Sequence, residues 1–406
     1  MLKLIIGLML LASSHVYAAE LSWQDKLSWQ NIQKNWQDDV QFHGFLSQGL
    51  ISSSGNNVYG HSKNSVSALT EVGLNASYQY SSQISFAIQG LYRRAGSTTG
   101  KNGIGVLDYA FMDYRFFNDN QWQVGIRGGR IKNPWGLYNE TRDVSFTRPT
   151  MFMPLPYYER SRGLVLAMNG GQVYVNQFTS WGDLYFKFNL GVTESDQELL
   201  IAVTSNPAIS GKLNTSGVNF LTQLRYEILE GQYVFAVSYA QMDFEYKGLS
   251  PIYNNLQVPI RPLMLSMQYN GERFSLAAEY NLQWNHFYGA LVPEIKNVSE
   301  GWYIQGGYKI LDNLEATIRY DQTARDKDDP LGKKISALSG GLMPAYYLFT
   351  HDTTISLRWD VTPEWMLRAE YHRVHGASNI SMIDNPDIGD IAEHWNIYAL
   401  QVAFRF

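Results

Sequence analysis

The chain has 406 residues, of which only 17% are charged, and its net charge is −5 with no basic excess, which excludes nucleic acid as an expected partner. The mean hydropathy of −0.25 is too polar for a helical membrane protein. It suits a barrel, whose residues face lipid and water alternately, and the abundance of Tyr and Trp suits the aromatic girdles of a barrel. A large secreted β-sandwich has similar averages, so the order of the residues must decide between these two classes.

Residues 1–18 have the pattern of a signal peptide. Lys3 supplies a positive charge, residues 4–12 are apolar, and Ala18 ends a small-residue cleavage motif. This apolar run is too short to cross a bilayer as a helix, and no later segment has the roughly 20 uninterrupted apolar residues that a membrane helix needs. Because the chain contains no cysteine, an exported fold cannot depend on disulfides.

Residues 19–40 predict a short amphipathic periplasmic helix. Trp29, Ile32, Trp36 and Val40 recur at helical spacing, and the tetrapeptide LSWQ occurs twice in this segment. Such a helix can help protomers to associate or can lie against the rim of a barrel. The sequence leaves both roles open.

Residues 41–406 predict an all-β fold, a transmembrane antiparallel β-barrel. Segments of about 9 to 12 residues, the length of a tilted membrane strand, are separated alternately by tight turns and by long loops. Short periplasmic turns and long extracellular loops are typical of outer-membrane barrels. The tight turns are expected at residues 81–82, 118–121, 170–171, 229–232, 270–273, 311–313 and 362–364. The long loops are expected at residues 54–65, 95–105, 132–162, 204–217, 247–259, 288–299, 324–350 and 375–394.

This alternation gives about 18 strands, an even number that places both ends of the barrel domain on the side of the short turns. The segment 198–203 is the weakest strand of the series, and its rejection leads to about 16 strands. Either barrel is wide enough for a water-filled channel.

The third long loop, residues 132–162, is the chief candidate for a functional site. Charges that line a narrow passage set ion preference, whereas charges on a loop in solvent merely pair with one another. Its four prolines would stiffen the loop in either place. The candidate constriction residues are Arg127, Arg130, Glu140, Arg142, Asp143, Arg148, Glu159, Arg160 and Arg162.

Several later strands have one apolar and one charged face. A charge at the middle of the lipid face costs about 2–4 kcal/mol for Arg, so the charged faces are assigned to the lumen. The residues expected to face the lumen are Glu279, Arg319, Asp321, Arg358, Asp360, Arg368, Glu370 and Arg405.

The last strand, WNIYALQVAFRF at residues 395–406, resembles the assembly signal of Gram-negative outer-membrane proteins. The residues that match the alternating apolar pattern with a terminal aromatic are Tyr398, Leu400, Val402, Phe404 and Phe406. The stretches 42–56 and 129–156 resemble porins of the broad phosphate-selective and general type. This resemblance implies a homotrimer and a third loop folded into the barrel. It also implies contact with lipid, lipopolysaccharide and the barrel-assembly machinery.

We therefore expect a porin in the Gram-negative outer membrane that passes small hydrophilic solutes, with a mild preference for anions. One alternative is a channel that prefers oligosaccharides or organic acids, with Trp135, Tyr138, Tyr157 and Tyr158 as a stacking track. Another is a barrel enzyme such as a lipase or protease, but His43 and Ser47 are too far apart for a nucleophile and its base. We expect no enzyme activity and no cofactor. Neither His351, His372 and His375 nor the acidic run 326–329 has metal-site spacing, so no metal is expected.

Overall fold

The computed structural model of the chain describes residues 40–63, 67–96, 99–100, 102–204, 206, 208–291 and 293–406. The chain divides into two units, Met1–Gln41 and Phe42–Phe406, and the second contains the barrel. The expected signal peptide and residues 19–39 of the expected helix lie outside the described residues. Val40, expected as the last residue of that helix, is the first residue of a strand.

The described residues form strands joined by irregular segments with short helices. The strands are β1 (Val40–Ser53), β2 (Ser67–Gln79), β3 (Ile84–Arg94), β4 (Ile104–Asn118), β5 (Trp122–Lys132), β6 (Ala167–Thr179), β7 (Gly182–Thr193), β8 (Lys212–Thr215), β9 (Asn219–Ile228), β10 (Tyr233–Lys247), β11 (Gln257–Asn270), β12 (Phe274–Phe287), β13 (Ile295–Leu311), β14 (Leu314–Ala324), β15 (Phe349–Asp360), β16 (Trp365–Gly376) and β17 (His394–Arg405). The helices are α3 (Gly163–Leu166), α4 (Gln197–Thr204) and α5 (Lys333–Leu338), with 3-10 turns η2 (Asn139–Thr141), η3 (Ser145–Thr147), η4 (Leu155–Tyr157), η5 (Glu159–Ser161), η6 (Ala345–Tyr347) and η7 (Ile388–Asp390).

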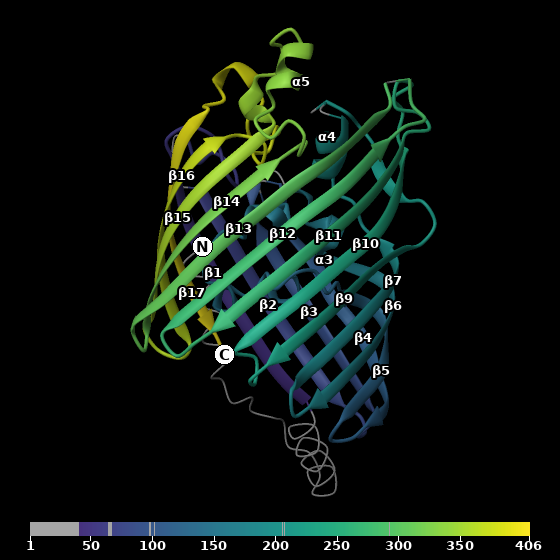
Figure 1. Ribbon diagram of the computed structural model, residues 1–406, viewed down its shortest axis with the longest axis vertical. Coiled ribbons are helices and arrows are strands. Elements are labelled where there is room, and N and C mark those ends of the chain that lie inside the picture. Colours follow the sequence, from purple (N-terminus) through teal and green to yellow (C-terminus); the bar gives the residue numbers. More distant parts are fainter. Residues whose placement is uncertain are drawn as a thin grey trace, which may run out of the picture. The chain divides into compact units, whose positions relative to one another are not determined.

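The strands close into an antiparallel ring (Figure 1). Apart from β8, each strand pairs with the next one along the chain, so that β7 pairs with β9. Strand β17 returns to pair with β1, from Phe45↔Arg405 to Ser53↔Ile397. The short strand β8 adds to the extracellular end of β10 and is not a member of the ring, which therefore contains 16 strands. The all-β barrel is confirmed with the alternative count of 16, and the preferred count of about 18 is wrong.

Two segments account for the difference in the strand count. Residues 198–203, expected as a strand, belong to helix α4, whose first turn is capped by the Asp196 carboxylate accepting the Leu199 N–H at 2.8 Å. The apolar residues of α4 follow one another without a clear period, so their pattern fits a buried strand and a buried helix equally well. The glycines at 170–171 do not form a turn but lie inside β6. A Cβ on Gly170 would come within 2.1 Å of the Leu190 carbonyl oxygen, so close strand packing explains this glycine.

The outer face of the ring is apolar. In β12, the side chains of Leu276, Tyr280 and Trp284 are exposed, whereas Glu279 and Asn281 between them are buried. Exposed aromatic residues gather near the short turns, where Phe274 packs against Tyr308 across neighbouring strands with ring centroids 4.8 Å apart. Among the described residues, no helix has the length and apolar character needed to cross a bilayer.

Part of the barrel interior is packed like the core of a soluble protein. One apolar cluster joins residues of the connection between β5 and β6, including Trp135 and Tyr157, to Leu200 of α4 and to inner-face residues of β9–β13 such as Met242 and Met264. A second cluster joins Met151 of the same connection to Ile51 on β1 and Ile397 on β17. The connection between β5 and β6 therefore packs against opposite walls of the ring.

Candidate functional site: the inward loop

The connection 133–166 between β5 and β6, here called the inward loop, lies inside the ring and contacts strands around most of its circumference. Its first anchor is Gly136, whose N–H donates to Ser238 Oγ on β10 at 3.1 Å and whose carbonyl accepts from Gln223 Nε2 on β9 at 3.0 Å. Gly136 has φ +59°, and a Cβ there would lie 2.4 Å from the Tyr157 hydroxyl oxygen. Only glycine fits this close approach without strain.

The second anchor is the buried carboxylate of Glu279 on β12. It accepts hydrogen bonds from the Leu137 N–H at 2.9 Å and from the hydroxyls of Tyr157 at 2.6 Å and Tyr303 at 2.9 Å. The Ser266 hydroxyl is a fourth donor at 2.5 Å. A buried carboxylate is tolerated when its oxygens accept this many hydrogen bonds.

The third anchor comes from charged residues of β14 and β16, which bind the backbone of the middle of the inward loop. Asp321 accepts the Leu155 N–H at 3.0 Å, and Glu370 accepts the Met151 N–H at 2.5 Å. Arg319 donates to the Phe152 carbonyl at 3.1 Å, and Arg368 donates to the Arg148 carbonyl at 2.7 Å. Because these side chains of the wall bind main-chain atoms, they fix the path of the loop backbone directly.

The fourth anchor is a buried network of charges on the β2–β5 wall. Arg148 pairs with Glu71 on β2 at 3.1 Å, and Asp143 pairs with Lys132 on β5 at 2.9 Å and with Arg162 at 2.5 Å. Glu159 pairs with Arg142 at 2.5 Å, with Arg162 and with Arg93 on β3. Burial acts to raise the pKa of the Glu159 carboxyl, but the three surrounding guanidinium groups outweigh it and lower the pKa to about 2.

The predicted constriction residues therefore separate into three groups. Arg142, Asp143, Arg148, Glu159 and Arg162 belong to the buried network and hold the loop. Three others lie inside the ring, and each forms an ion pair outside that network. Arg127 pairs with Asp113 at 3.1 Å, Glu140 with Lys187 at 2.8 Å, and Arg160 with Glu198 at 3.3 Å.

Arg130 stands apart from the other predicted constriction residues. It is paired in register with Asn169 and Ala110, on the same face as the exposed Val173 and Met112, and it bonds to Glu194 at 3.0 Å. Arg130 is three positions after the inward-facing Arg127, and strand alternation places residues at such spacing on opposite faces. The expectation that both arginines line the passage is therefore wrong for Arg130.

The residues predicted to face the lumen lie on the inner faces of their strands. Glu279, Arg319, Asp321, Arg368 and Glu370 make the anchor contacts described above. Arg358 donates to the Phe146 carbonyl at 3.0 Å and pairs with Asp360, and the Arg405 guanidinium lies 4.4 Å from the centre of the Phe146 ring. All of these residues except Asp360, which among the described residues pairs with Arg358 only, contact the inward loop.

Four predicted assembly-signal residues lie on the outer face of β17 at the seam of the ring, and the fifth, Phe406, follows the last residue of that strand. Tyr398, Leu400 and Phe406 are more than half exposed. Phe406 exchanges backbone hydrogen bonds with Gly44 of β1 at 3.0 and 3.2 Å. A Cβ on Gly44 would come within 2.5 Å of the Phe406 ring.

A cavity of about 540 Å³, here called the vestibule, lies on the extracellular side of the inward loop. Most of its lining is apolar, for example Leu348, Val374 and Ile397, and Arg160 and Arg325 are among its charged groups. Burial, together with the nearby Arg160, lowers the pKa of Arg325 to about 10, so its guanidinium remains charged at neutral pH. The vestibule was not predicted from the sequence, although Val374 on β16 and Trp395 and Ile397 on β17 place apolar side chains on the inner face near the rim.

Two of the weaker sequence candidates can be placed as well. Trp135, Tyr138 and Tyr157 are buried in the apolar core, so of the four aromatic residues proposed as a stacking track only Tyr158 lines the vestibule. The Ser47 hydroxyl donates to Glu71 at 3.4 Å, while His43 is exposed near the start of β1. The structure does not bring this pair into the arrangement of a nucleophile and its base.

No protein-family model matches the chain, and no curated protein matches its sequence. Solved outer-membrane channels share its fold. The outer membrane channel DcaP of Acinetobacter baumannii is 14% identical over 91% of this chain and 97% of its own, with a TM-score of 0.58. OprB of Pseudomonas putida is 12% identical over 93% and 97% of the two chains, with a TM-score of 0.58. OmpF of Salmonella typhi, solved in complex with daunomycin, is 12% identical over 90% and 97%, with a TM-score of 0.53.

The chain therefore has the fold of Gram-negative outer-membrane porins, and the resemblance seen in the sequence is confirmed at the level of the fold. Identities this low say nothing about the solute.

Proposed function

We propose that this chain is an outer-membrane channel through which small hydrophilic solutes diffuse down their gradients without a chemical step. The observation that carries the proposal is a closed ring of 16 strands with an apolar outer face, crossed by a loop that wall residues hold in place. Barrels of this size enclose a water-filled passage, and a fixed inner loop narrows it. Recordings of the purified protein in planar bilayers test the proposal, and we expect stepwise increases in conductance. Folded protein that gives no conductance steps would contradict the proposal.

A mild preference for anions is part of this proposal. The inward loop contains four arginines against three acids, and one net positive charge in a poorly screened passage favours anions. All four arginines are paired, so the preference should be small. The reversal potential across a KCl gradient measures it, and clear cation selectivity would contradict it.

A preference for organic acids over sugars is the second candidate function, and the vestibule is the observation that favours it. Its largely apolar wall suits a solute with an apolar body, and Arg160 and Arg325 offer guanidinium groups to a carboxylate. The burial of Trp135, Tyr138 and Tyr157 removes three of the four aromatic residues that were expected to stack on a sugar.

Liposome swelling separates the two candidate functions when sugars and carboxylates of matched size are compared. A general pore sorts solutes by size alone, whereas an acid-preferring channel passes the carboxylate faster, and Arg325→Gln should remove that difference. Lys296→Gln, which changes another cation of the vestibule wall, serves as the matched control.

Location and partners complete the proposal. Its apolar outer face suits contact with outer-membrane lipid and lipopolysaccharide, and β17 suits recognition by the barrel-assembly machinery. Phe406→Ala should lower the amount of folded, heat-modifiable protein in outer membranes while synthesis and export continue. The homotrimer rests on the resemblance to porins, and crosslinking in mild detergent that captures only monomers would contradict it.

A further inference from the structure

A row of histidines crosses the outer face of the barrel at the extracellular ends of β15, β16 and β17. The strand register places His351 opposite His375, and His375 opposite His394. Side chains directly opposite one another on antiparallel strands have Cβ atoms about 4.5–5.5 Å apart. The row lies on the same face as the exposed Ile355 and Tyr398, away from the vestibule.

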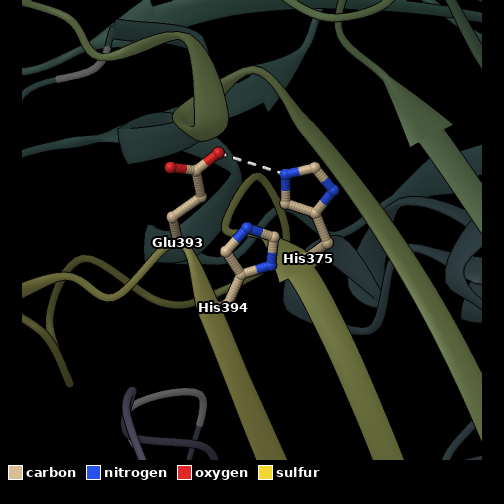
Figure 2. A group of neighbouring side chains, drawn as sticks. All are labelled: His375, Glu393 and His394. Carbon is tan, nitrogen blue, oxygen red and sulfur yellow. Dashed lines mark hydrogen bonds and ion pairs between the residues drawn. The ribbon is translucent and has the colours of Figure 1, made fainter.

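Glu393, the residue before β17, adds a carboxylate to this row (Figure 2). His375 Nε2 lies 3.1 Å from Glu393 Oε1, and one ligand atom each from His375, Glu393 and His394 lie within 4.8 Å of one another. Glu393 and His394 are exposed and His375 is half-buried, so an ion can reach them. Within the part of the chain that the structure describes, no other group of three or more His, Cys, Asp or Glu residues converges in this way.

Two imidazole nitrogens and one carboxylate oxygen are a donor set for transition metals such as Zn²⁺, whereas Mg²⁺ and Ca²⁺ prefer oxygen ligands alone. Tetrahedral Zn²⁺ with ligands at about 2.0–2.2 Å keeps the donor atoms about 3.4 Å apart. The present cluster is somewhat wider, and the rings of His375 and His394 are stacked at 4.2 Å with an interplanar angle of 21°. Tilting these rim side chains brings both lone pairs toward one ion.

His351 is the next histidine of the row and lies beside this group of three ligands, but it does not belong to it. Nε2 of His351 is buried and has no hydrogen-bond partner among the described residues, and its ring centroid lies 5.7 Å from that of His375. A water molecule, or this nitrogen after a change of the His351 rotamer, completes a four-coordinate site.

We propose that His375, Glu393 and His394 form a binding site for one divalent transition-metal ion of the Zn²⁺ type at the extracellular rim. The ion joins the end of β16 to the start of β17 and so fixes both ends of the connection 377–393. Residues of that connection, such as Asn379 and Ile380, line the vestibule. Metal binding therefore restrains one wall of the vestibule, although the site itself does not depend on which solute passes through the barrel.

The chain contains a matched control for this site. His286 and Glu294 form a similar exposed pair at 2.6 Å near the end of β12, but no third ligand joins them among the described residues. Loss of this pair should leave metal binding unchanged, because two ligands are fewer than a structural Zn²⁺ site uses.

Calorimetric titration of the full folded chain in detergent, treated with EDTA and then dialysed, tests the proposal. We expect one Zn²⁺ per chain and no saturable Mg²⁺ binding. His375→Ala, His394→Ala and Glu393→Gln should each weaken Zn²⁺ binding by at least about tenfold. His286→Ala should bind Zn²⁺ as the unmodified chain does. Heat-modifiable mobility shows whether each variant is folded, and the nearly isosteric Glu393→Gln keeps the test valid if a histidine variant does not fold.

A spectroscopic readout separates this site from adsorption. Cu²⁺ bound to the unmodified chain should show nitrogen hyperfine coupling in electron paramagnetic resonance, and His375→Ala with His394→Ala should remove it. Equal Zn²⁺ binding by the unmodified chain and this double variant would overturn the site. Binding that appears only after lipopolysaccharide is added would also overturn it, since the cluster would then serve lipid phosphates.

Discussion

The inward loop and the connection 325–348 are both long extracellular connections, yet they lie in different places. The inward loop is held by buried charges of the wall, such as Arg319 and Glu279, which bind its backbone. The connection 325–348 lies on the rim with α5 (Figure 1), and none of the residues of α5 is buried. Its charges bond locally, as Lys334 does when its ammonium donates to the Asp328 carbonyl at 3.0 Å. The partners that the rest of the barrel offers, rather than the length of a loop, decide whether it enters the lumen.

The largest expected effect comes from removing the inward loop. Replacement of residues 137–160 by a short Gly-Ser linker should raise single-channel conductance at least about twofold, because the passage loses its narrowest part. The matched replacement of residues 336–342 on the rim, none of which lines the vestibule, should leave conductance unchanged. Planar-bilayer recordings of heat-modifiable protein measure both, and equal conductance of the two variants would abolish the contrast between the two connections.

The second effect concerns a single wall anchor. Arg319→Ala leaves Asp321 buried without its cation and removes the donor to the Phe152 carbonyl. Loss of one partner from a buried ion pair costs about 3–5 kcal/mol. Urea unfolding in liposomes, followed by Trp fluorescence, should show this loss, and Lys333→Ala on α5 should have no measurable effect. A stability equal to that of the unmodified chain would show that Arg319 does not hold the loop.

A smaller effect is expected from Glu279→Gln. The amide oxygen can accept only part of the hydrogen bonds that the carboxylate receives from Leu137, Tyr157, Tyr303 and Ser266. Leaving buried donors unsatisfied costs about 1–3 kcal/mol. Limited proteolysis should then cut the inward loop faster, whereas cleavage within 325–348 should keep its rate. If both rates stay the same, Glu279 is not an anchor.

The smallest expected effect is on pH dependence. The pKa of Glu159 is lowered in the folded state from its ordinary value of 4.5 to about 2. The stabilisation from this group is therefore complete above about pH 4.5 and is lost as the pH falls toward 2. Conductance noise from a mobile inward loop should increase over this range. Glu159→Gln should show that noise already at neutral pH, and a variant that stays quiet would contradict the assignment.

The outer half of the fold was predictable from the sequence, because lipid imposes an apolar face on every strand and short turns on one rim. In β12 the alternation alone gives the exposed Leu276 and Trp284 and the buried Glu279. The strand count was wrong where this signal is weakest, at glycines 170–171 and at the apolar run of α4, since neither segment carries a clear period of two.

The inner half was less predictable. The arginines of the inward loop are visible in the sequence, but their partners are not, because residues such as Glu71 and Arg148 lie far apart in the chain and are neighbours only in the folded barrel. Because these arginines form ion pairs with buried acids, they hold the loop in place and are not free charges in the pore. The inner face of β10 carries Met242, Phe244 and Tyr246 where water was expected, since α4 and the inward loop cover it. Alternation tells which face a residue is on, but not what covers that face.

Gly136 and Leu137 are bound to β9, β10 and β12, while Arg148 and Glu159 of the same segment are bound to β2 and β3. The inward loop therefore connects opposite sides of the barrel wall through contacts that do not pass through the neighbouring strands. A ring held only by hydrogen bonds between neighbouring strands can flatten into an ellipse under lateral pressure from the membrane. A loop bound to both sides of the wall resists that flattening. The cross-section of the passage should therefore stay constant when the bilayer is stretched or compressed.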